Sequence, residues 1–321
     1  MVQKVILNTS ELGTICKLNK YGKISDVTEK LWKRYNRKTY IEAYESVSTD
    51  DTVGLTNYHK EQNALKSNGL ENIIPKGFIK DVNNLTQLNN KKKDFIKDMD
   101  TNIQANEKKE ITKLKKLYLF GQIKKDDMDK KVNQIKKQKK EEKKLIKNYI
   151  EHKLNTQHGI KQEDTALDIY IKETGVEVEQ DTSLHYMQIY SDKKVDLSLC
   201  GKIDGYDMTN DKILEVKNRR YRFMKDVPKY EYAQIQGYLQ MFDVDTGTLI
   251  QCYKGKFKKC IKYEDIEKDD EFWKTQIEPK LVNYAKWLVK LVIDKELYSE
   301  YFKHDVKKRD KWIYSNYLSS K

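Results

Sequence analysis

Two carboxylates and an ammonium group lie within a short stretch of this 321-residue chain, between residues 201 and 217. Asp204 precedes a polar turn, and Glu215 and Lys217 follow that turn in a short apolar run. Two such runs separated by a polar turn are typical of a β-hairpin. We therefore expect Asp204 at the end of the first strand, and Glu215 and Lys217 on the second.

The second strand of this hairpin is expected to have one apolar face and one polar face. Side chains alternate across a strand, so Leu214 and Val216 would share one face, and Glu215 and Lys217 the other. The apolar pair suits a protein core. The charged pair, with Asp204 across the hairpin, would then meet at one edge of a sheet.

A grouping of carboxylates at one edge is costly unless a cation offsets their repulsion, because neighbouring carboxylates raise each other's pKa. Hard oxygen ligands of this kind suit Mg²⁺, with Mn²⁺ able to substitute. A bound ion could activate water and orient a phosphodiester for hydrolysis. Lys217 would then hold or deprotonate that water, or neutralise charge on the phosphate. A half-solvated edge hairpin shows the same alternation, so spacing alone leaves that alternative open.

Several motifs of the chain resemble those of known nucleases. Asp204 followed by Glu215-Val216-Lys217 resembles the D…(D/E)xK core of the PD-(D/E)XK nuclease superfamily, with Ile203 in place of the proline. Three further segments resemble YqaJ-like viral recombinases, which are lambda-exonuclease-type proteins, and these segments are Leu7–Gly13, Gly159–Glu163 and Gln234–Tyr238. The resemblance covers about residues 1–40 and 155–290. Four blocks in the family's order are far more specific than any single block.

The resemblance implies a role for each candidate catalytic residue. It implies three metal ligands, namely Asp204, Glu215 and the backbone carbonyl of Val216. Glu163 would complete the ligand shell, and Lys217 would position the water. Gln234 resembles the family glutamine that binds phosphate or supports the metal site.

Candidate contacts to DNA flank these residues. Arginines alternate with aromatic residues after the hairpin, a pattern that suits phosphate contact and base stacking, although a solvated loop has the same composition. Ser10 lies in the segment that, in the resembled family, helps to hold a terminal 5′-phosphate, with a plain helix cap as the alternative. Tyr238 shares a helix face with Gln234 and suits packing as well. The candidate DNA contacts are Ser10, Lys202, Arg219, Arg220, Arg222 and Tyr238.

Composition limits the remaining possibilities. The formal net charge is +13 and 35% of residues are charged, which favours an anionic polymer as partner, although a solvated lysine-rich surface is the alternative. The four cysteines form no CxxC pair and the five histidines show no zinc-ligand spacing, which argues against a zinc site and for a reducing compartment. The absence of a long apolar run or signal segment predicts a soluble intracellular protein.

Much of the positive charge lies in one segment. Between residues 91 and 150 the chain has 20 lysines and 10 acidic residues. Apolar residues at helical spacing on both sides of Gly121 predict an antiparallel helical hairpin. A basic arm that grips the phosphate backbone and a solvated coiled coil that acts as a spacer both fit this pattern.

The fold class that we expect is α/β, with a restriction-endonuclease-like mixed central sheet flanked by helices and an inserted basic helical hairpin. Helices are predicted over 26–37, 230–242 and 270–293, and a closing hairpin over 248–263. The predicted domains are an N-terminal helical part (1–90), the lysine-rich insertion (91–155), and a nuclease core with C-terminal helices (156–321).

The predicted function is a Mg²⁺-dependent deoxyribonuclease, namely a 5′→3′ double-strand exonuclease of viral recombination or replication. A structure-specific or nicking endonuclease and a non-catalytic basic DNA-binding protein are the alternatives. The expected partners are double-stranded DNA ends, a single-strand annealing protein and further copies of the chain, with no membrane. The expected location, for a viral protein, is the host cytoplasm or nucleus.

Overall fold

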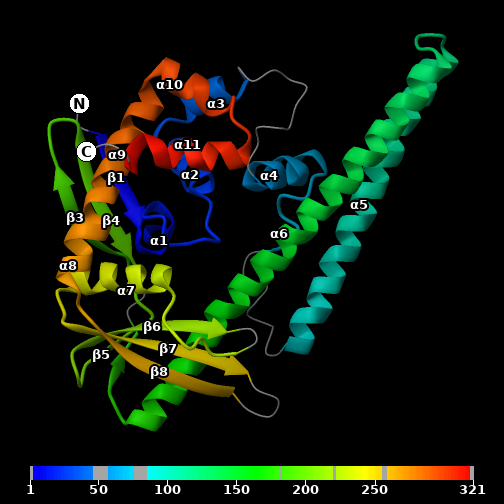
Figure 1. Cartoon of the computed structure of the whole chain (residues 1–321). Helices are drawn as coiled ribbons and strands as arrows, with labels where there is room; N and C mark the ends of the chain where they lie inside the picture. The colour runs from blue at the N-terminus through cyan, green and yellow to red at the C-terminus, as the bar shows by residue number, and fades with distance from the viewer. Residues whose placement is uncertain are drawn as a thin grey trace. The chain divides into compact units, whose positions relative to one another are not determined.

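The computed structural model describes residues 3–45, 57–75, 85–180, 183–219, 222–254 and 259–318. The chain forms two compact units (Figure 1). Unit 1 comprises residues 1–54 and 162–321, and unit 2 comprises residues 55–161. These boundaries differ from the predicted ones because helix α6 (Lys125–Thr174) contributes its first part to unit 2 and its last part to unit 1.

The described strands of unit 1 form two mixed sheets. In the smaller sheet, β4 (Val195–Gly201) lies between β1 (Gln3–Asn8), which runs parallel to it, and β3 (His185–Ser191), which runs antiparallel. The larger sheet has the order β2-β5-β6-β7-β8. Its strands are β2 (Val178–Glu179), β5 (Gly205–Asp207), β6 (Lys212–Arg219), β7 (Thr246–Lys254) and β8 (Lys259–Glu267).

Helix α7 (Lys229–Phe242) makes the crossover between the parallel strands β6 and β7 (Figure 1). Parallel neighbours require such a crossover, whereas the antiparallel pair β5–β6 is joined by a turn. The helix begins after Pro228 and ends at Asp243, which adopts a left-handed backbone conformation. Its apolar side packs with Ile203, Ile213 and Leu249, so the helix is fixed directly over β6.

The largest apolar core of unit 1 lies between the smaller sheet and the N- and C-terminal helices. These helices are α1 (Leu12–Ile15), α2 (Ile24–Tyr35), α3 (Arg37–Glu45), α8 (Asp270–Phe272), α9 (Glu278–Ile293), α10 (Lys295–Tyr301) and α11 (Val306–Leu318), with a π-helical turn at Trp273–Ile277. A fully buried ion pair joins Arg309 of α11 to Glu29 of α2 at 3.0 Å. The two ends of the chain are thereby tied together within unit 1.

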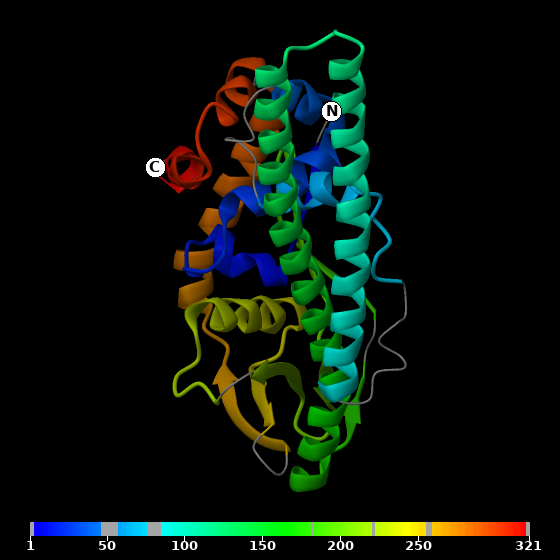
Figure 2. The same ribbon diagram turned by 90° about the vertical axis from the view of Figure 1, so that its right-hand side faces the viewer.

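Unit 2 contains α4 (Asn57–Ser67), α5 (Leu85–Leu119) and the first part of α6. Helices α5 and α6 lie side by side and run in opposite directions, as Figures 1 and 2 show. Among their described residues, ion pairs connect them at Lys92–Glu151, Asp100–Lys143 and Glu110–Lys139. Their apolar sides pack around Met99, Ile146 and Ile150. Unit 2 thus has a core of its own.

The predicted fold class is confirmed, because the chain is α/β with mixed sheets flanked by helices. The described strands form two sheets rather than the single predicted central sheet, because consecutive strands β4 and β5 belong to different sheets. The predicted helical hairpin is confirmed and extends past both predicted ends, to 85 and to 174. Among the helices that the structure describes, none combines the length and the apolar character needed to span a membrane.

Candidate active site

Asp204 lies at the break between the two sheets. Strand β4 ends at Gly201 and β5 begins at Gly205, so Lys202, Ile203 and Asp204 form the connection. Ile203 is buried under α7, which holds the connection in place. The backbone N–H of Asp204 donates to the carbonyl of Leu214 at 3.2 Å, and the Asp204 carboxylate accepts from the Val216 N–H at 2.7 Å.

Strand β6 has the two faces that its alternation predicts. Leu214 and Val216 are buried against Ala166 and Leu167 of α6. Glu215 and Lys217 lie on the α7 side, where the Lys217 ammonium donates to the Glu215 carboxylate and, at 3.1 Å, to Oε1 of Gln234. The same face therefore supplies both a buried acid and the cation that pairs with it.

Gln234 and Tyr238 connect α7 to this ion pair. Nε2 of Gln234 donates to the Glu215 carboxylate at 3.0 Å and to the Tyr238 hydroxyl at 3.3 Å. The Tyr238 hydroxyl donates to the carbonyl of Lys202 at 2.8 Å. Residues four apart share a helix face, and this spacing aligns both side chains with the connection that carries Asp204.

Glu163, in the part of α6 that belongs to unit 1, completes the acidic group. Burial raises its pKa to about 7, and the charge of Glu215 contributes to the rise. Burial also raises the pKa of Asp204, and the charge of Glu163 adds to this rise. Burial likewise raises the pKa of Glu215; the charge of Lys217 opposes this rise and that of Asp204 adds to it. The three carboxyl groups therefore oppose one another's ionisation.

The ammonium of Lys217 is held in its charged form. Burial would lower the pKa of Lys217, but the carboxylates of Glu215 and Asp204 outweigh burial and raise it. The side chain is only a quarter exposed. The Lys217 ammonium therefore partly neutralises the negative charge of the carboxylates around it.

The chemistry of the donors fits a small divalent ion. Mg²⁺ is held by one or two carboxylates and keeps several waters, and Asp204 and Glu215 provide two carboxylates. The N–H and C=O of a strand residue point to the same side, so the Val216 carbonyl faces the edge at which its N–H meets Asp204. Within the described part of the chain, no three His, Cys, Asp or Glu side chains are arranged as a ready metal site.

The candidate DNA contacts are found in different environments. Lys202 and Arg222 are exposed, and Arg220 lies outside the described residues. Arg219 is instead buried in a two-pronged ion pair with Glu231, at 2.7 and 2.6 Å. Tyr238 is also buried, and it packs rather than facing solvent.

The N-terminal segment differs from the predicted cap. Ser10 is exposed inside the short 3₁₀ helix Thr9–Glu11, and the residue before that helix is Asn8. The Asn8 N–H donates to the Glu11 carboxylate at 3.0 Å. Ser10 therefore does not cap the helix, and its proposed contact with phosphate remains a prediction.

Three buried residues near the site were not predicted. Thr9 is next to Tyr238, because a Cβ added to Gly201 would lie 2.6 Å from both side chains. Glu231 lies one turn before Gln234, so helical spacing could have indicated it. Gln251 accepts from Arg219 Nε at 2.8 Å, and a single amide in the apolar run Leu249–Cys252 was its only signal.

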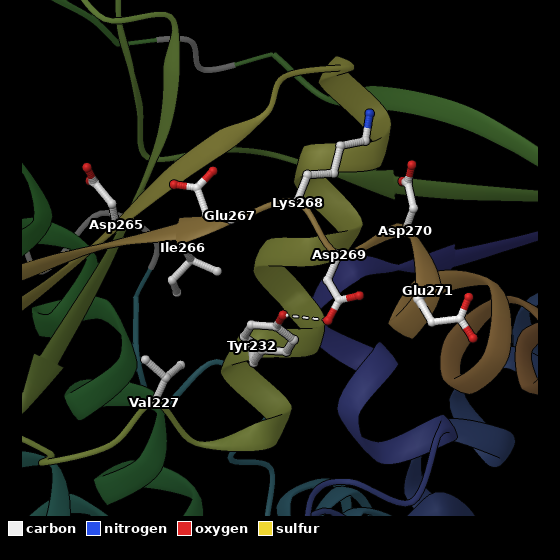
Figure 3. Close-up of a pocket in the computed structure, with 9 residues that line it drawn as sticks. All are labelled: Val227, Tyr232, Asp265, Ile266, Glu267, Lys268, Asp269, Asp270 and Glu271. Carbon is white, nitrogen blue, oxygen red and sulfur yellow. Dashed lines mark hydrogen bonds between the residues drawn. The ribbon is translucent and has the colours of Figure 1, made fainter.

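A surface cavity of about 710 Å³ contains none of these residues. It is lined by Val227, Tyr232 and residues 265–271, and five of those nine residues are acidic (Figure 3). Tyr232 donates to Asp269 at 3.1 Å at the cavity wall. Its negative charge makes it a poor surface for a phosphate backbone.

The family model of the YqaJ-like viral recombinase domain matches residues 118–247. This range includes Glu163, Asp204, Glu215, Lys217 and Gln234. The matched range differs from the predicted one in two ways. It begins inside the helical hairpin, which the predicted resemblance did not cover, and it does not include the segment around Ser10. Among curated proteins, none matches the chain.

Solved structures give weaker likenesses. The phage-related exonuclease from Haemophilus somnus 129PT is 15% identical, with 45% of this chain and 70% of that chain covered and a TM-score of 0.27. The alkaline exonuclease from Laribacter hongkongensis is 19% identical, with 49% and 75% covered and a TM-score of 0.28. The protein SSO0001 is 17% identical, with 41% of this chain covered and a TM-score of 0.26, and the chain spans only 55% of its length. Over residues 118–247, the chain is similar to the YqaJ-like viral recombinase domain.

Proposed function

We propose that this chain is a Mg²⁺-dependent deoxyribonuclease that degrades double-stranded DNA from its ends in the 5′→3′ direction. The observation that carries the proposal is the set formed by Glu163, Asp204 and Glu215, with Lys217 and Gln234 bonded to Glu215, inside the matched family region. A binding protein would gain nothing from gathering a buried and two partly buried acids, since charges removed from water are costly.

The carboxylates of Asp204 and Glu215 and the Val216 carbonyl would hold the ion, with Glu163 beside them. When bound, a divalent ion would supply Lewis-acid polarisation of the phosphodiester and a lower pKa for water. Lys217, as a cation in hydrogen-bond contact with Glu215, would hold the attacking water and offset charge on the phosphate. Gln234 would orient both Glu215 and Lys217 through its amide.

The substitution Glu215→Gln tests the activity. We expect loss of Mg²⁺-dependent cleavage by at least about a hundredfold, as for removal of a group that acts on the transition state. Binding of DNA in EDTA, measured by fluorescence anisotropy, should remain. Glu271→Gln, which changes an exposed acid of the surface cavity, is the matched control and should cleave normally. Full cleavage by Glu215→Gln would refute the assignment.

Polarity and end preference need a second experiment. A time course on linear duplexes labelled at the 5′ or the 3′ end should release the 5′ label first. Duplexes with a 5′-phosphate should be degraded faster than those with a 5′-hydroxyl, and Ser10→Ala should reduce that difference. Equal cleavage of a covalently closed circle would instead favour the endonuclease reading.

A further inference from the structure

The turn that joins α5 and α6 exposes a cluster of apolar side chains. Leu119 and Phe120 are 78% and 76% exposed, and Leu117 and Tyr118 are also exposed. The core of unit 2 is formed by other residues, which lie on α4, α5 and α6 and at Leu70 after α4. Four neighbouring apolar side chains therefore face solvent without contributing to a core.

These side chains lie on ordered backbone. The N–H of Gln122 donates to the carbonyl of Leu117, and that of Gly121 donates to the carbonyl of Tyr118, both at 2.9 Å. Gly121 has a φ of +69°. This pair of bonds with a left-handed glycine is the Schellman motif that ends a helix. Leu119 and Phe120 are thus presented on a fixed support.

Lysines surround the same turn. Residues 113–125, which we call the hairpin tip, contain five lysines and no acidic residue. The lysines are Lys113, Lys115, Lys116, Lys124 and Lys125, and all are exposed. Lys113 and Lys116 are three residues apart on α5, and Phe120 follows four residues later, directly after the helix, so the three lie on the same side of the chain. The tip therefore offers a cationic surface with an aromatic ring in its midst.

This combination matches the chemistry of unpaired nucleotides. Single-stranded nucleic acid is bound by basic groups along its phosphates and by aromatic side chains that stack on its bases. A paired duplex hides its base faces and would use the lysines alone. An acidic protein partner would satisfy the lysines but would leave the ring of Phe120 without a stacking partner.

We propose that the hairpin tip binds unpaired DNA, with Phe120 and Leu119 against the bases and the surrounding lysines on the phosphates. The choice of DNA over RNA rests on the proposed function. The site lies within unit 2 and is independent of the carboxylates. An end-directed nuclease produces single strands, so such a site would retain the strand that is not degraded.

The test compares the wild-type chain with the double variant Leu119→Ser/Phe120→Ser in EDTA, which removes the divalent ion that the proposed nuclease activity requires. Fluorescence anisotropy is measured with a labelled single-stranded oligonucleotide and with a covalently closed duplex that has no free end. We expect on the order of tenfold weaker binding of the single strand by the variant, because base stacking is lost. Binding of the closed duplex should not change.

Two further variants separate the contributions. Lys115→Gln/Lys116→Gln should weaken both DNAs and reduce the dependence of affinity on salt, since two phosphate contacts are removed. Ile293→Ser, which changes another exposed apolar residue, should bind both DNAs as the wild type does. Unchanged melting temperatures would show that the variants remain folded.

Wild-type affinity of the Leu119→Ser/Phe120→Ser variant for the single strand would overturn the proposal. Two other results with this variant would also overturn it, if DNA binding stays intact. Loss of cosedimentation with phosphatidylserine vesicles would show that the tip contacts lipid. A changed elution volume in size-exclusion chromatography would show that the tip contacts a second copy of the chain. The nuclease function is tested separately by Glu215→Gln in Mg²⁺. The two experiments therefore distinguish failure of the nuclease proposal from failure of the proposal for the hairpin tip.

Discussion

At the scale of single residues, the candidate site depends on bonds that join β6 to α7. The alternation of β6 and the spacing of Gln234 and Tyr238 were sufficient to predict which side chains share a face of the same element, because both follow from local geometry. The burial of Arg219 and its side-chain partners could not be predicted in this way. Its partners, Glu231 and Gln251, lie 12 and 32 residues further along the chain and meet it only after folding.

The Arg219–Glu231 pair should position Gln234. Arg219 lies on β6 two residues after Lys217, and Glu231 lies on α7 one turn before Gln234, so the pair joins the strand to the helix. Both side chains are more than 90% buried. Glu231→Gln should lower the free energy of unfolding by about 3–5 kcal/mol, because it leaves a buried charge without its partner. Cleavage should fall at least tenfold, through kcat, while DNA affinity in EDTA holds. Denaturant unfolding and steady-state kinetics measure the two effects.

A double variant provides the control for this pair. Arg219→Gln/Glu231→Gln removes both charges and should recover part of the lost stability, since neither charge is then unpaired. It should not recover kcat, because α7 is no longer tied to β6. Recovery of both quantities together would show that the pair acts only through stability.

Asp26 should make stability depend on pH. Burial raises the pKa of this α2 carboxyl; the charge of Lys23 opposes the rise and that of Asp310 adds to it. Within the described structure its Oδ1 is buried and makes no hydrogen bond. A raised pKa means that the folded state binds the proton more tightly, so this contribution to stability falls as pH rises from about 4 through the folded pKa.

Asp26→Asn should therefore melt at a higher temperature than the wild type at pH 7, and at nearly the same temperature at pH 3.5. Thermal unfolding at a series of pH values measures the difference. Asp305→Asn, which changes a partly exposed carboxylate near α11, is a suitable comparison because no such gain with pH is expected there. A constant difference between Asp26→Asn and wild type across the series would contradict the prediction.

At the scale of elements, the break between β4 and β5 positions Asp204. The sequence predicted β6, the α7 helix and the β7–β8 hairpin, since each has a local apolar pattern. It placed Asp204 at the end of the first hairpin strand, whereas the strand that pairs with β6 begins after it, at Gly205. The continuation of α6 through residue 155 to Glu163 was not predicted. The composition changes there from lysine-rich to mixed, but a helix does not end where composition changes unless a breaking residue or a cap is present.

Gly201→Ala should disturb this break. A Cβ at Gly201 would lie 2.6 Å from Oγ1 of Thr9 and from Cε1 of Tyr238, closer than side-chain atoms approach. Overpacking of this kind costs about 1–3 kcal/mol. We expect a lower denaturant midpoint and reduced cleavage, because Tyr238 bonds both Gln234 and the carbonyl of Lys202. Ser10→Ala, on the exposed side of the same turn, should leave the midpoint unchanged.

At the scale of the whole molecule, the chain combines two units with different kinds of core. Unit 1 packs helices on two sheets, whereas unit 2 packs helices against each other. Unit 2 also buries a polar cluster, in which Lys139 pairs with Glu110 and Glu142 at 2.9 and 3.1 Å, and Asn68 donates to Glu142 at 2.7 Å. These bonds join α5, α6 and the end of α4, and so fix the register of the three segments.

Unit 2 should consequently fold by itself. A fragment of residues 55–161 keeps all nine members of its buried apolar core and the whole polar cluster. Domains of about 100 residues with their own core can fold alone. Circular dichroism should show high helix content and a single cooperative thermal transition. Ile146→Ala, at a fully buried core position, should destabilise the fragment by about 2–5 kcal/mol, whereas Lys130→Ala, on the exposed surface of α6, should not. A gradual, non-cooperative loss of helix on heating would mean that unit 2 requires unit 1 in order to fold.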